Sequence, residues 1–553
     1  MILTAHGGHI MDIFCENQIC RFPAGSSAGD VWRYLHGDTV SEEAVLAENE
    51  GAILDFQTPL PDGASISWVP VHSKHGHLAY QRTLIMLLVC AVRSIYGPEA
   101  DIQVKHSLGD GLYCRFPDGH IPLAGELARL EKAMRAIAEE GRPIRQVFIQ
   151  WEDALCFLKE KGRTEEAELL ARHPCPSFGV YRCGDITDYY FGPMLPHMGY
   201  IRSFCLVPYA PGFLLRFPAL GEREIGPYKE EPLFAKVFLE AEEWGEIIGC
   251  HDVAELNRAI ETGEIRKLIA MAEARHEKSL GYLADRISSQ KPKIRLVCIA
   301  GPSSAGKTTF MNRLIIQLWV NGVRPVMVSL DDFYRERTAG ENINYENLSA
   351  LDVELFQKLM GELLEGRRIR LPRFDFRTGK RSWSDEEFQL GKDQPVMVEG
   401  LHALNPELTH FVPGYQCMHI YLGALTQLSI NSHNRISTTD TRLLRRLVRD
   451  SRTRGMTSEG TLASWNRVRR GEEENIFLFQ GRAEEIFNTA LLYELPVLKK
   501  KAVPLLRQIN RSSSQYAEAQ RLLTFLMPFG ELDDSAVPDH SILREFIGGR
   551  HEG

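Results

Sequence analysis

The sequence lacks several features that define large classes of protein. It has no Cys-x-x-Cys pair, and its 11 cysteines, odd in number, are scattered from Cys15 to Cys417. That pattern is typical of reduced thiols and excludes a disulfide scaffold. The longest uninterrupted apolar run is Leu84–Val92, far short of the roughly 20 residues that span a bilayer. The first residues carry no basic, apolar leader pattern, so we expect a cytoplasmic protein without a membrane-spanning segment.

Internal repeats and low-complexity tracts are also missing, and the composition is that of a folded protein. Hydrophobic residues make up 44% of the 553 residues and charged residues 25%, which excludes disorder as the main state. The length suggests three or four domains. The net charge of -9 disfavours a whole-protein nucleic-acid binder but leaves local basic patches open.

The hydrophobic patterns divide the chain into four regions. Residues 1–71 contain short alternating segments around turns and one helix-like stretch, which predicts a compact β-grasp-like unit. Residues 72–275 mix amphipathic helices with strands punctuated by Gly and Pro, which predicts an α+β domain. In 276–510, wholly apolar strands alternate with helices, as in a parallel sheet with helices on both faces. Residues 511–553 predict a helix and a tail with little chemistry.

The strongest motif is Gly301–Thr308, which fits the phosphate-loop pattern GxxxxGK[ST] between an apolar strand and a helix. Glycines let backbone N–H groups turn toward phosphate oxygens, and the N-terminus of the following helix adds partial positive charge. Lys307 can reach the β- and γ-phosphates, and the Thr308 hydroxyl can ligate Mg²⁺. The alternative is a glycine-rich turn that binds no nucleotide.

Two acids follow later strands of the same region. Asp331 comes at the end of PVMVSL and Glu399 at the end of PVMVEG, so both are expected at the ligand edge of a parallel sheet. Asp331 could orient and deprotonate an attacking hydroxyl, or it could cap the next element. Glu399 suits the Mg²⁺ side of a phosphate-loop site, or it could serve as a cap or salt-bridge partner.

A basic helix lies further along the chain. Residues 435–470 hold ten arginines against three acids, Asp440, Asp450 and Glu459. Four of the arginines occur at i, i+3, i+4 and i+7 on one predicted helix face, opposite a Leu/Val face: Arg442, Arg445, Arg446 and Arg449. The pattern favours a phosphate-binding surface or a lid, with a solvated charged face as the alternative.

With these motifs in order, the block from Ile294 to about Gln508 resembles the uridine kinase / phosphoribulokinase family of P-loop kinases. GPSSAGKTT, SLDDFY, VEG and DTRLLRRLVRDSRTRG are similar to the loop, base, acid and arginine-lid segments of that family. The resemblance implies ATP binding by Gly301, Ser303, Ser304, Ala305, Gly306, Lys307, Thr308, Thr309, Arg442 and Arg454. It implies catalytic roles for Lys307, Asp331, Arg446 and Arg449, and Mg²⁺ ligation by Thr308 and Glu399.

The resemblance also implies an acceptor site. NYENLSALD places Glu346 where the family binds ribose hydroxyls, LPRFDFRTGKR is similar to the base pocket, and the implied contacts are Asp331, Tyr334, Glu346, Phe374 and Phe376. Pyrimidine-specific members carry a histidine where this chain has Gly379. Weak discrimination among nucleosides, with purines accepted, is therefore expected.

The N-terminal half carries a second resemblance. Residues 11–71 resemble a TGS domain, and residues 72–220 resemble the second N-terminal domain of threonyl-tRNA synthetase. The four positions that hold the synthetase's ligands are occupied here by Arg82, Met86, Tyr190 and Met194, so neither zinc binding nor editing is expected. Three nearby histidines in HSKHGH (His72, His75 and His77) are expected to be solvated in a loop, with a metal site as the less favoured alternative.

These observations together predict an α/β P-loop kinase domain preceded by a β-grasp TGS-like domain and an α+β synthetase-like domain. The predicted activity is phosphoryl transfer from ATP, with Mg²⁺, to the 5′-hydroxyl of a small-molecule nucleoside. A sugar phosphate is an alternative acceptor, since Arg335 and Arg337 follow the predicted base. The alternative from another class is an ATP-switched regulatory protein. RNA contact through the N-terminal domains and assembly as a homo-oligomer are further expectations.

Overall fold

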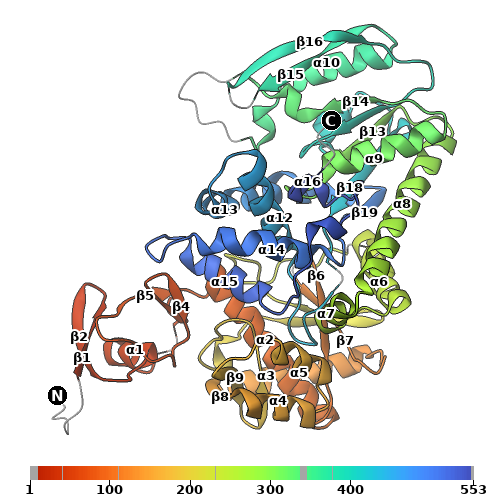
Figure 1. Cartoon of the computed structure of the whole chain (residues 1–553). Helices are drawn as coiled ribbons and strands as arrows, with labels where there is room; N and C mark the ends of the chain where they lie inside the picture. Colours follow the sequence, from red (N-terminus) through yellow and green to blue (C-terminus); the bar gives the residue numbers. More distant parts are fainter. Residues whose placement is uncertain are drawn as a thin grey trace.

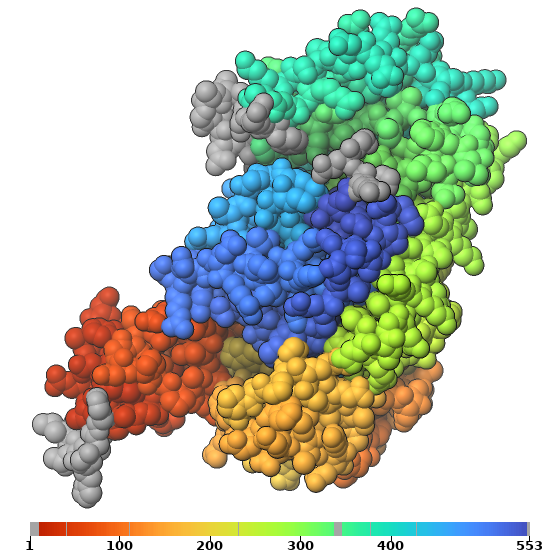
Figure 2. Space-filling view, viewed as in Figure 1, coloured from red at the N-terminus to blue at the C-terminus, as the bar shows by residue number. Residues whose placement is uncertain are grey.

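The computed structural model describes residues 10–39, 41–109, 111–230, 232–336, 345–375, 378–426 and 428–549. The molecule is elongated, and three parts follow one another in chain order. An N-terminal lobe projects at the lower left, a second lobe forms the base, and the C-terminal half rises above it (Figures 1 and 2).

The N-terminal lobe is one mixed sheet with one helix. Its order is β2-β1-β5-β3-β4, with β1 and β5 parallel. Ser27 and Asp30 form a reciprocal capping box that starts the helix, and Met11, Ile13 and Val31 lie in the core beneath it. The expected short strands around one helix are present. The elements are β1 (Ile10–Cys15), β2 (Gln18–Pro23), α1 (Ala28–His36), β3 (Leu46–Asn49), β4 (Ala52–Leu54) and β5 (Ser65–Val69).

The second lobe is α+β, as expected. Two antiparallel sheets, β11-β12-β7-β6 and β10-β9-β8, pack with helices around α2 (Lys74–Tyr96). The other elements are β6 (Gln103–Leu108), β7 (Gly111–Arg115), α3 (Ala124–Glu139), β8 (Arg145–Gln150), α4 (Trp151–Glu160), α5 (Thr164–Ala171), β9 (Ser177–Cys183), β10 (Ile186–Asp188), β11 (Cys205–Tyr209) and β12 (Gly212–Arg216).

Helix α2 has two notable properties. Among the described residues it is the one helix long and apolar enough to cross a membrane, yet most of it is buried inside the lobe, including all of Leu84–Val92. It also begins earlier than expected, because Ser73 caps it by accepting from the N–H of Gly76. The prediction that His75 and His77 lie solvated in a loop is therefore wrong. Both are on the first turn, partly buried, and burial lowers the pKa of each to about 4.

Two of the four positions that replace the synthetase's ligand residues lie next to one another in space. Arg82 on α2 donates from Nε and Nη2 to the carbonyl of Pro193, at 2.9 and 2.7 Å. Pro193 directly precedes Met194, whose side chain is fully buried, as is that of Met86. The segments that carry Arg82 and Met194 therefore lie together. A guanidinium with thioethers and a phenol does not form a zinc-binding set.

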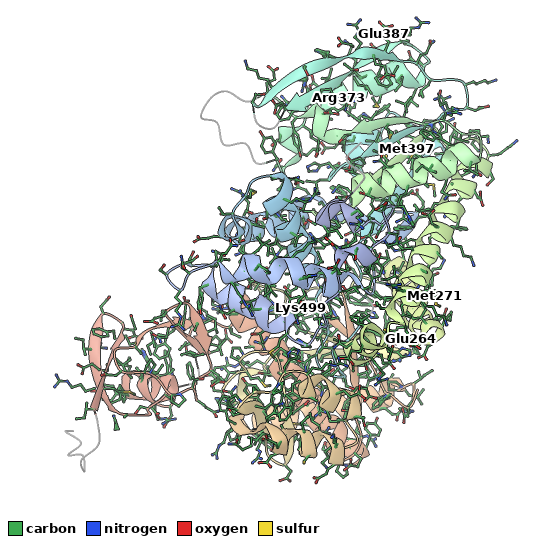
Figure 3. All side chains as sticks on the ribbon, viewed as in Figure 1. Glu264, Met271, Arg373, Glu387, Met397 and Lys499 are labelled. Atoms are coloured by element: carbon green, nitrogen blue, oxygen red, sulfur yellow. The ribbon has the colours of Figure 1, made fainter. Side chains whose placement is uncertain are left out.

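Helices α6 (Pro232–Ile248), α7 (Val253–Thr262) and α8 (Ile265–Ser289) connect the two halves. The start of α8 differs from the expected helix at 276, because buried residues continue along one face from Ile265 through Leu268 and Ala272 to Leu280. The domain boundary placed between 275 and 276 therefore falls inside a continuous helix. Figure 3 shows Glu264 and Met271 at its lower end, while its upper end packs on α9 (Lys307–Val320).

The C-terminal half is built on a wholly parallel five-stranded sheet. Its order is β14 (Val326–Ser329), β17 (Val396–Glu399), β13 (Leu296–Ala300), β18 (Cys417–Gly423) and β19 (Glu485–Asn488). Separate hydrophobic cores cover its two faces, one including Phe310 and Leu444, the other Phe356 and Leu363. The predicted parallel sheet with helices on both faces is confirmed.

The C-terminal half contains further elements around this sheet. They are α10 (Val353–Leu364), β15 (Ile369–Asp375), β16 (Lys380–Phe388), α11 (Pro406–Thr409), α12 (Thr438–Thr453), α13 (Ser458–Asn475), α14 (Glu494–Arg507), α15 (Tyr516–Leu526) and α16 (Arg544–Ile547), with 3₁₀ turns at Leu330–Phe333, Leu348–Ala350, Gly414–Gln416, Phe477–Arg482 and Asp534–Ala536. The 3₁₀ turn at Met198–Tyr200 belongs to the second lobe. The antiparallel hairpin β15–β16 extends over α10 at the top of the molecule, where Figure 3 labels Arg373 and Glu387.

The halves are joined by a buried ionic cluster around His433. Its Nδ1 contacts Asp188 of the second lobe and its Nε2 lies 2.9 Å from Asp101 Oδ1. Arg163 donates to Asp188 at 2.7 Å. Burial alone would lower the pKa of His433, but the two carboxylates outweigh it and raise the pKa to about 10. An imidazolium therefore fastens the loop before α12 to the N-terminal half.

We expect His433→Gln to lower the melting temperature most at pH 5–6.5 and progressively less toward pH 10. The folded pKa of His433 lies above its unfolded value of about 6.5, so the stabilisation is complete below pH 6.5 and is lost as the pH rises through 10. Breaking a buried ion pair costs about 3–5 kcal/mol of unfolding free energy. Thermal melts across this range test it, with exposed His410→Gln as the control. A pH-independent difference between wild type and His433→Gln would contradict the charged state.

Candidate functional site

The turn between β13 and α9 has the geometry of an anion site. Gly306 adopts φ +88° as the residue before the first turn of α9, and a Cβ on Gly301 would stand 2.7 Å from the carbonyl oxygen of Leu422. Both positions therefore require glycine. Among the described residues, no acceptor is present for the backbone N–H groups of Gly306, Lys307 and Thr308, which begin the helix. Such donors at a helix N-terminus are suited to phosphate oxygens.

The side chains of Lys307, Thr308 and Thr309, at the end of the loop, differ in what they contact. Lys307 Nζ donates to the loop carbonyls of Gly301 (3.0 Å) and Pro302 (3.4 Å), so it lies directly over the turn. Thr308 is exposed. The Thr309 hydroxyl and N–H are engaged by the Glu545 carboxylate, at 2.9 and 3.3 Å. The sequence had indicated no chemistry for the region that holds Glu545.

A buried carboxylate supports the loop from behind. Glu472 on α13 is fully buried; its Oε1 accepts from the Ser303 N–H at 2.8 Å and pairs with Arg442. Arg442 Nε in turn donates to the Ser303 carbonyl at 3.0 Å. Sequence reasoning missed Glu472, since nothing in the run Glu472–Glu474 distinguishes the inward-facing acid from its neighbours.

The arginines of α12 serve different purposes. Arg442 and Arg445 are buried, so the alternative of a solvated charged face is excluded for them. Arg445 contacts Glu494, the Ser304 carbonyl and Thr489 instead of the open site. The periodicity had placed it on the ligand-binding face with the others. Both residues hold the phosphate loop against α12.

Three other arginines gather at the mouth of the site around one acid. Asp450 lies 3.2 Å from Arg446, 2.7 Å from Arg449 and 3.6 Å from Arg454. Arg446 also donates to the Ser303 hydroxyl at 2.8 Å. Desolvation and crowding by like charges lower the pKa values of Arg446 and Arg454. Three cations facing a single carboxylate leave positive charge that a polyphosphate can neutralise.

The two adjacent aspartates at the edge of the sheet, Asp331 and Asp332, differ in their hydrogen-bond partners. Asp332 accepts from the Phe374 N–H (3.1 Å) and Arg373 (3.3 Å), and so anchors the hairpin. Asp331 is exposed and has no hydrogen-bond or ion-pair partner among the described residues. Desolvation by the surrounding walls raises its pKa, while Lys307 and Arg454 oppose the shift. Asp331 is therefore the carboxylate available for chemistry.

Glu399 ends β17 beneath this edge. It is buried, and its Oε1 accepts from the Ser329 hydroxyl at 2.9 Å. Burial and the charge of Asp331 raise its pKa to about 7. Glu399, Asp331 and the Thr308 hydroxyl are hard oxygen ligands, the set that Mg²⁺ prefers together with phosphate and water. This oxygen chemistry fits Mg²⁺ held jointly with a phosphate.

The expected acceptor residues lie together on the far side of Asp331. Tyr334 is buried and donates its hydroxyl to the Tyr345 carbonyl at 2.8 Å, and its ring lies 5.8 Å from that of Phe374. Tyr334 thus positions this segment, and its hydroxyl is already engaged. Glu346 packs against α13, where a Cβ on Gly471 would stand only 2.4 Å from the Glu346 Cβ. Desolvation raises the pKa of Glu346.

Two further expectations concern the hairpin turn. Phe376 lies outside the described residues. Gly379 adopts φ +68° and donates its N–H to the Asp375 carbonyl at 2.7 Å. The glycine is thus required by the turn, and a histidine there would strain it. The absence of a histidine at 379 therefore has a backbone cause and gives no evidence on base preference.

Comparison with known proteins agrees with this division of the chain. Residues 296–487 match the model of the Phosphoribulokinase / Uridine kinase family. The N-terminal region is similar to threonine–tRNA ligase from Nitratidesulfovibrio vulgaris (24% identical over 205 residues, 37% of this chain and 32% of the ligase) and from Geobacter sp. (27% over 191 residues, 34% and 30%). The chain thus spans about a third of the length of these relatives.

Among solved structures, similarity is found to a possible uridine kinase from Bacillus stearothermophilus, with 27% identity, a TM-score of 0.23, and coverage of 27% of this chain and 80% of that one. Phosphoribulokinase from Rhodobacter spheroides is 19% identical with a TM-score of 0.25, covering 35% and 70%. The match to the family model thus falls within the C-terminal half, over the parallel sheet and the phosphate loop.

We expect Glu472→Gln to destabilise the protein and weaken nucleotide binding, because it leaves Arg442 buried without a charged partner and loosens Ser303. The cost should be about 3–5 kcal/mol of unfolding free energy. Glu473→Gln is the matched control, since Glu473 is exposed and pairs only with Arg469 at 2.9 Å. Thermal melts and ATP titration of both variants test this. If the two variants had the same melting temperature and ATP affinity, Glu472 would not support the phosphate loop.

Proposed function

We propose that this protein is an ATP-dependent kinase that phosphorylates a hydroxyl group of a small acceptor, with the 5′-hydroxyl of a nucleoside as the preferred acceptor. The observation that carries the proposal is the Asp331 carboxylate at the edge of the parallel sheet, which interacts electrostatically with Lys307 and Arg454 and has no hydrogen-bond or ion-pair partner among the described residues. An ATP-binding switch needs no base on the acceptor side, so this group favours an enzyme over a regulatory binding protein.

The residues divide the chemistry between them. Asp331 accepts the proton of the attacking hydroxyl as that oxygen bonds to the γ-phosphorus and the bond to the β-phosphate oxygen breaks. Lys307, Arg446, Arg449 and Arg454 stabilise the charge that spreads over the transferred group and the leaving ADP. Thr308 and Glu399 would hold Mg²⁺, which supplies charge neutralisation at the phosphates. Helix α12 closes the site against water, which would otherwise compete as acceptor.

The nucleoside assignment rests on the acceptor side. Glu346 offers a carboxylate suited to a pair of ribose hydroxyls, and Phe374 offers a ring at the edge of the same aromatic group. For a phosphorylated acceptor, additional cations would be needed, and Arg335 already donates its Nε to the Leu351 carbonyl at 3.1 Å. These contacts favour an uncharged acceptor.

The proposal is tested by incubating the protein with ATP and Mg²⁺ and a panel of acceptors: the four common nucleosides, ribulose 5-phosphate and glycerate. ADP release and mass analysis of the product identify both the acceptor and the site of phosphorylation. Phosphorylation of a nucleoside at the 5′-oxygen supports the proposal. Turnover with the sugar phosphate alone would change the acceptor class, and nucleotide binding without turnover on any acceptor would favour the regulatory alternative.

We expect Asp331→Asn to lower kcat by about 10²–10⁴-fold, the usual cost of losing a general base, with the KM for ATP nearly unchanged. Asp332→Asn is the matched control and should affect mainly the acceptor KM, because Asp332 anchors the hairpin at Phe374 and Arg373. Steady-state kinetics on both variants provide the comparison. A larger kcat loss in Asp332→Asn would show that the neighbouring carboxylate is the base.

We expect Lys307→Ala to reduce turnover by several orders of magnitude while the melting temperature stays near that of the wild type. Among the described residues, the hydrogen bonds of Lys307 go to the loop carbonyls of Gly301 and Pro302, so its removal loses transition-state stabilisation and little folding energy. Lys293→Ala, outside the site, is the control. Turnover close to that of the wild type in Lys307→Ala would refute the phosphate-loop assignment.

A further inference from the structure

The C-terminal segment 541–549 lies directly on the phosphate loop. Ile542 packs over its last residue: its Cδ1 and Cγ1 stand 2.8 Å from where a Cβ on Gly306 would be. Three residues later, Glu545 Oε2 accepts from the hydroxyl and the N–H of Thr309. Figure 1 shows α16 beside α12, at the end of α9 that begins with Lys307. The end of the chain thus covers the loop that the C-terminal half uses for phosphate.

A carboxylate in this position takes the place of a phosphate oxygen. The N–H of Thr309 belongs to the first turn of α9, where helix geometry supplies no intrahelical acceptor, and Gly306 has no side chain that could cap it. An anion at this turn is stabilised by the helix dipole as well as by the two hydrogen bonds. Glu545 also lies close enough to Glu399 to raise the pKa of that residue. A nucleotide polyphosphate would add several negative charges to this space and repel Glu545.

The segment is held by the same helix that carries the arginines of the site. Arg452 donates to the Glu545 carbonyl at 3.2 Å, and its side chain packs on Gly548. The Arg445 guanidinium lies 5.0 Å from the centre of the Phe546 ring. Movement of α12 toward a bound nucleotide would therefore change the contacts that retain α16. Ile542, Leu543 and Phe546 belong to the hydrophobic core, so the segment is packed rather than loosely attached.

We infer that residues 541–549 form an internal plug, in which Glu545 occupies a phosphate position of the loop and must leave before a nucleotide binds fully. The inference rests on the proposed function, since it assumes that the loop binds ATP. The apparent Kd for ATP then equals the Kd of the open form divided by the fraction of molecules in which the plug is open. It also couples nucleotide entry to the position of α12. A purely structural role for Glu545, as a cap for α9, is the competing explanation.

The test is calorimetric titration of ATP into the wild type, Glu545→Gln and Asp539→Asn. Asp539 lies two residues before this segment, is exposed, and is 3.9 Å from Arg544, which makes it the matched control. The plug predicts that Glu545→Gln lowers the Kd for ATP by about 5–10-fold, the effect of raising a small open fraction toward one, with Asp539→Asn within twofold of the wild type. An unchanged Kd with a lowered melting temperature shows a structural cap and overturns the plug. A raised Kd makes Glu545 part of the nucleotide site and also overturns it.

Hydrogen exchange of the wild-type amides at 541–549 gives a second measurement that does not depend on a variant folding. Faster exchange of these amides on adding ATP supports the plug, whereas unchanged or slower exchange overturns it. If the proposed function is wrong, neither the wild type nor Glu545→Gln binds ATP, and the plug is refuted as well. That result differs from every outcome in which only the plug is wrong. Equal ATP affinity in the two proteins removes the plug and leaves the kinase proposal standing.

Discussion

The buried pair between Glu472 and Arg442 is the contact on which the site depends. The two charges lie out of solvent, where an unpaired partner would be costly, so α12 and α13 stay locked together at this point. Both residues also hydrogen-bond the Ser303 backbone, so the shape of the phosphate loop is fixed by the packing of two helices distant in sequence. The same helix places Arg446 and Arg449 beside the loop, where Arg446 also donates to the Ser303 hydroxyl at 2.8 Å.

The N-terminal half is joined to this assembly through polar contacts. The loop before α12 carries His433 into the second lobe, and the Ser432 carbonyl accepts from the Val104 N–H at 2.8 Å. Further along, Arg521 on α15 contacts Asp440 on α12 at 2.6 Å, and Lys74 of α2 contacts Glu518 at 2.8 Å. These contacts involve the loop before α12, α12 itself, or α15, which pairs with α12. A change in the N-terminal half therefore has a direct physical route to the site.

Much of the architecture could be predicted from the sequence, because apolar strands, glycine turns and helical periodicity are local signals. The parallel sheet, the loop at Gly301–Thr308 and the acid edge at Asp331 and Glu399 were all indicated in this way. What local patterns could not reveal were pairings across long sequence separations. Glu472, Glu545 and His433 acquire their roles only from what folds against them. For Arg445 the predicted helix face was correct, but the periodicity could not show whether the side chain binds a ligand or pairs with Glu494, as it does.

Helix α8 has a practical consequence for dissecting the protein. Its 25 residues extend about 37 Å at the usual rise of an α-helix, and they run without interruption from the base of the molecule to the flank of α9. Near its middle, Glu273 accepts from the Tyr493 hydroxyl, and further on Glu277 accepts from Arg313 at 2.8 Å. A truncation at residue 276 would remove nearly half of this helix, including Glu273, which accepts from the Tyr493 hydroxyl. An isolated C-terminal fragment should therefore begin before Asp252, the residue that caps the preceding helix.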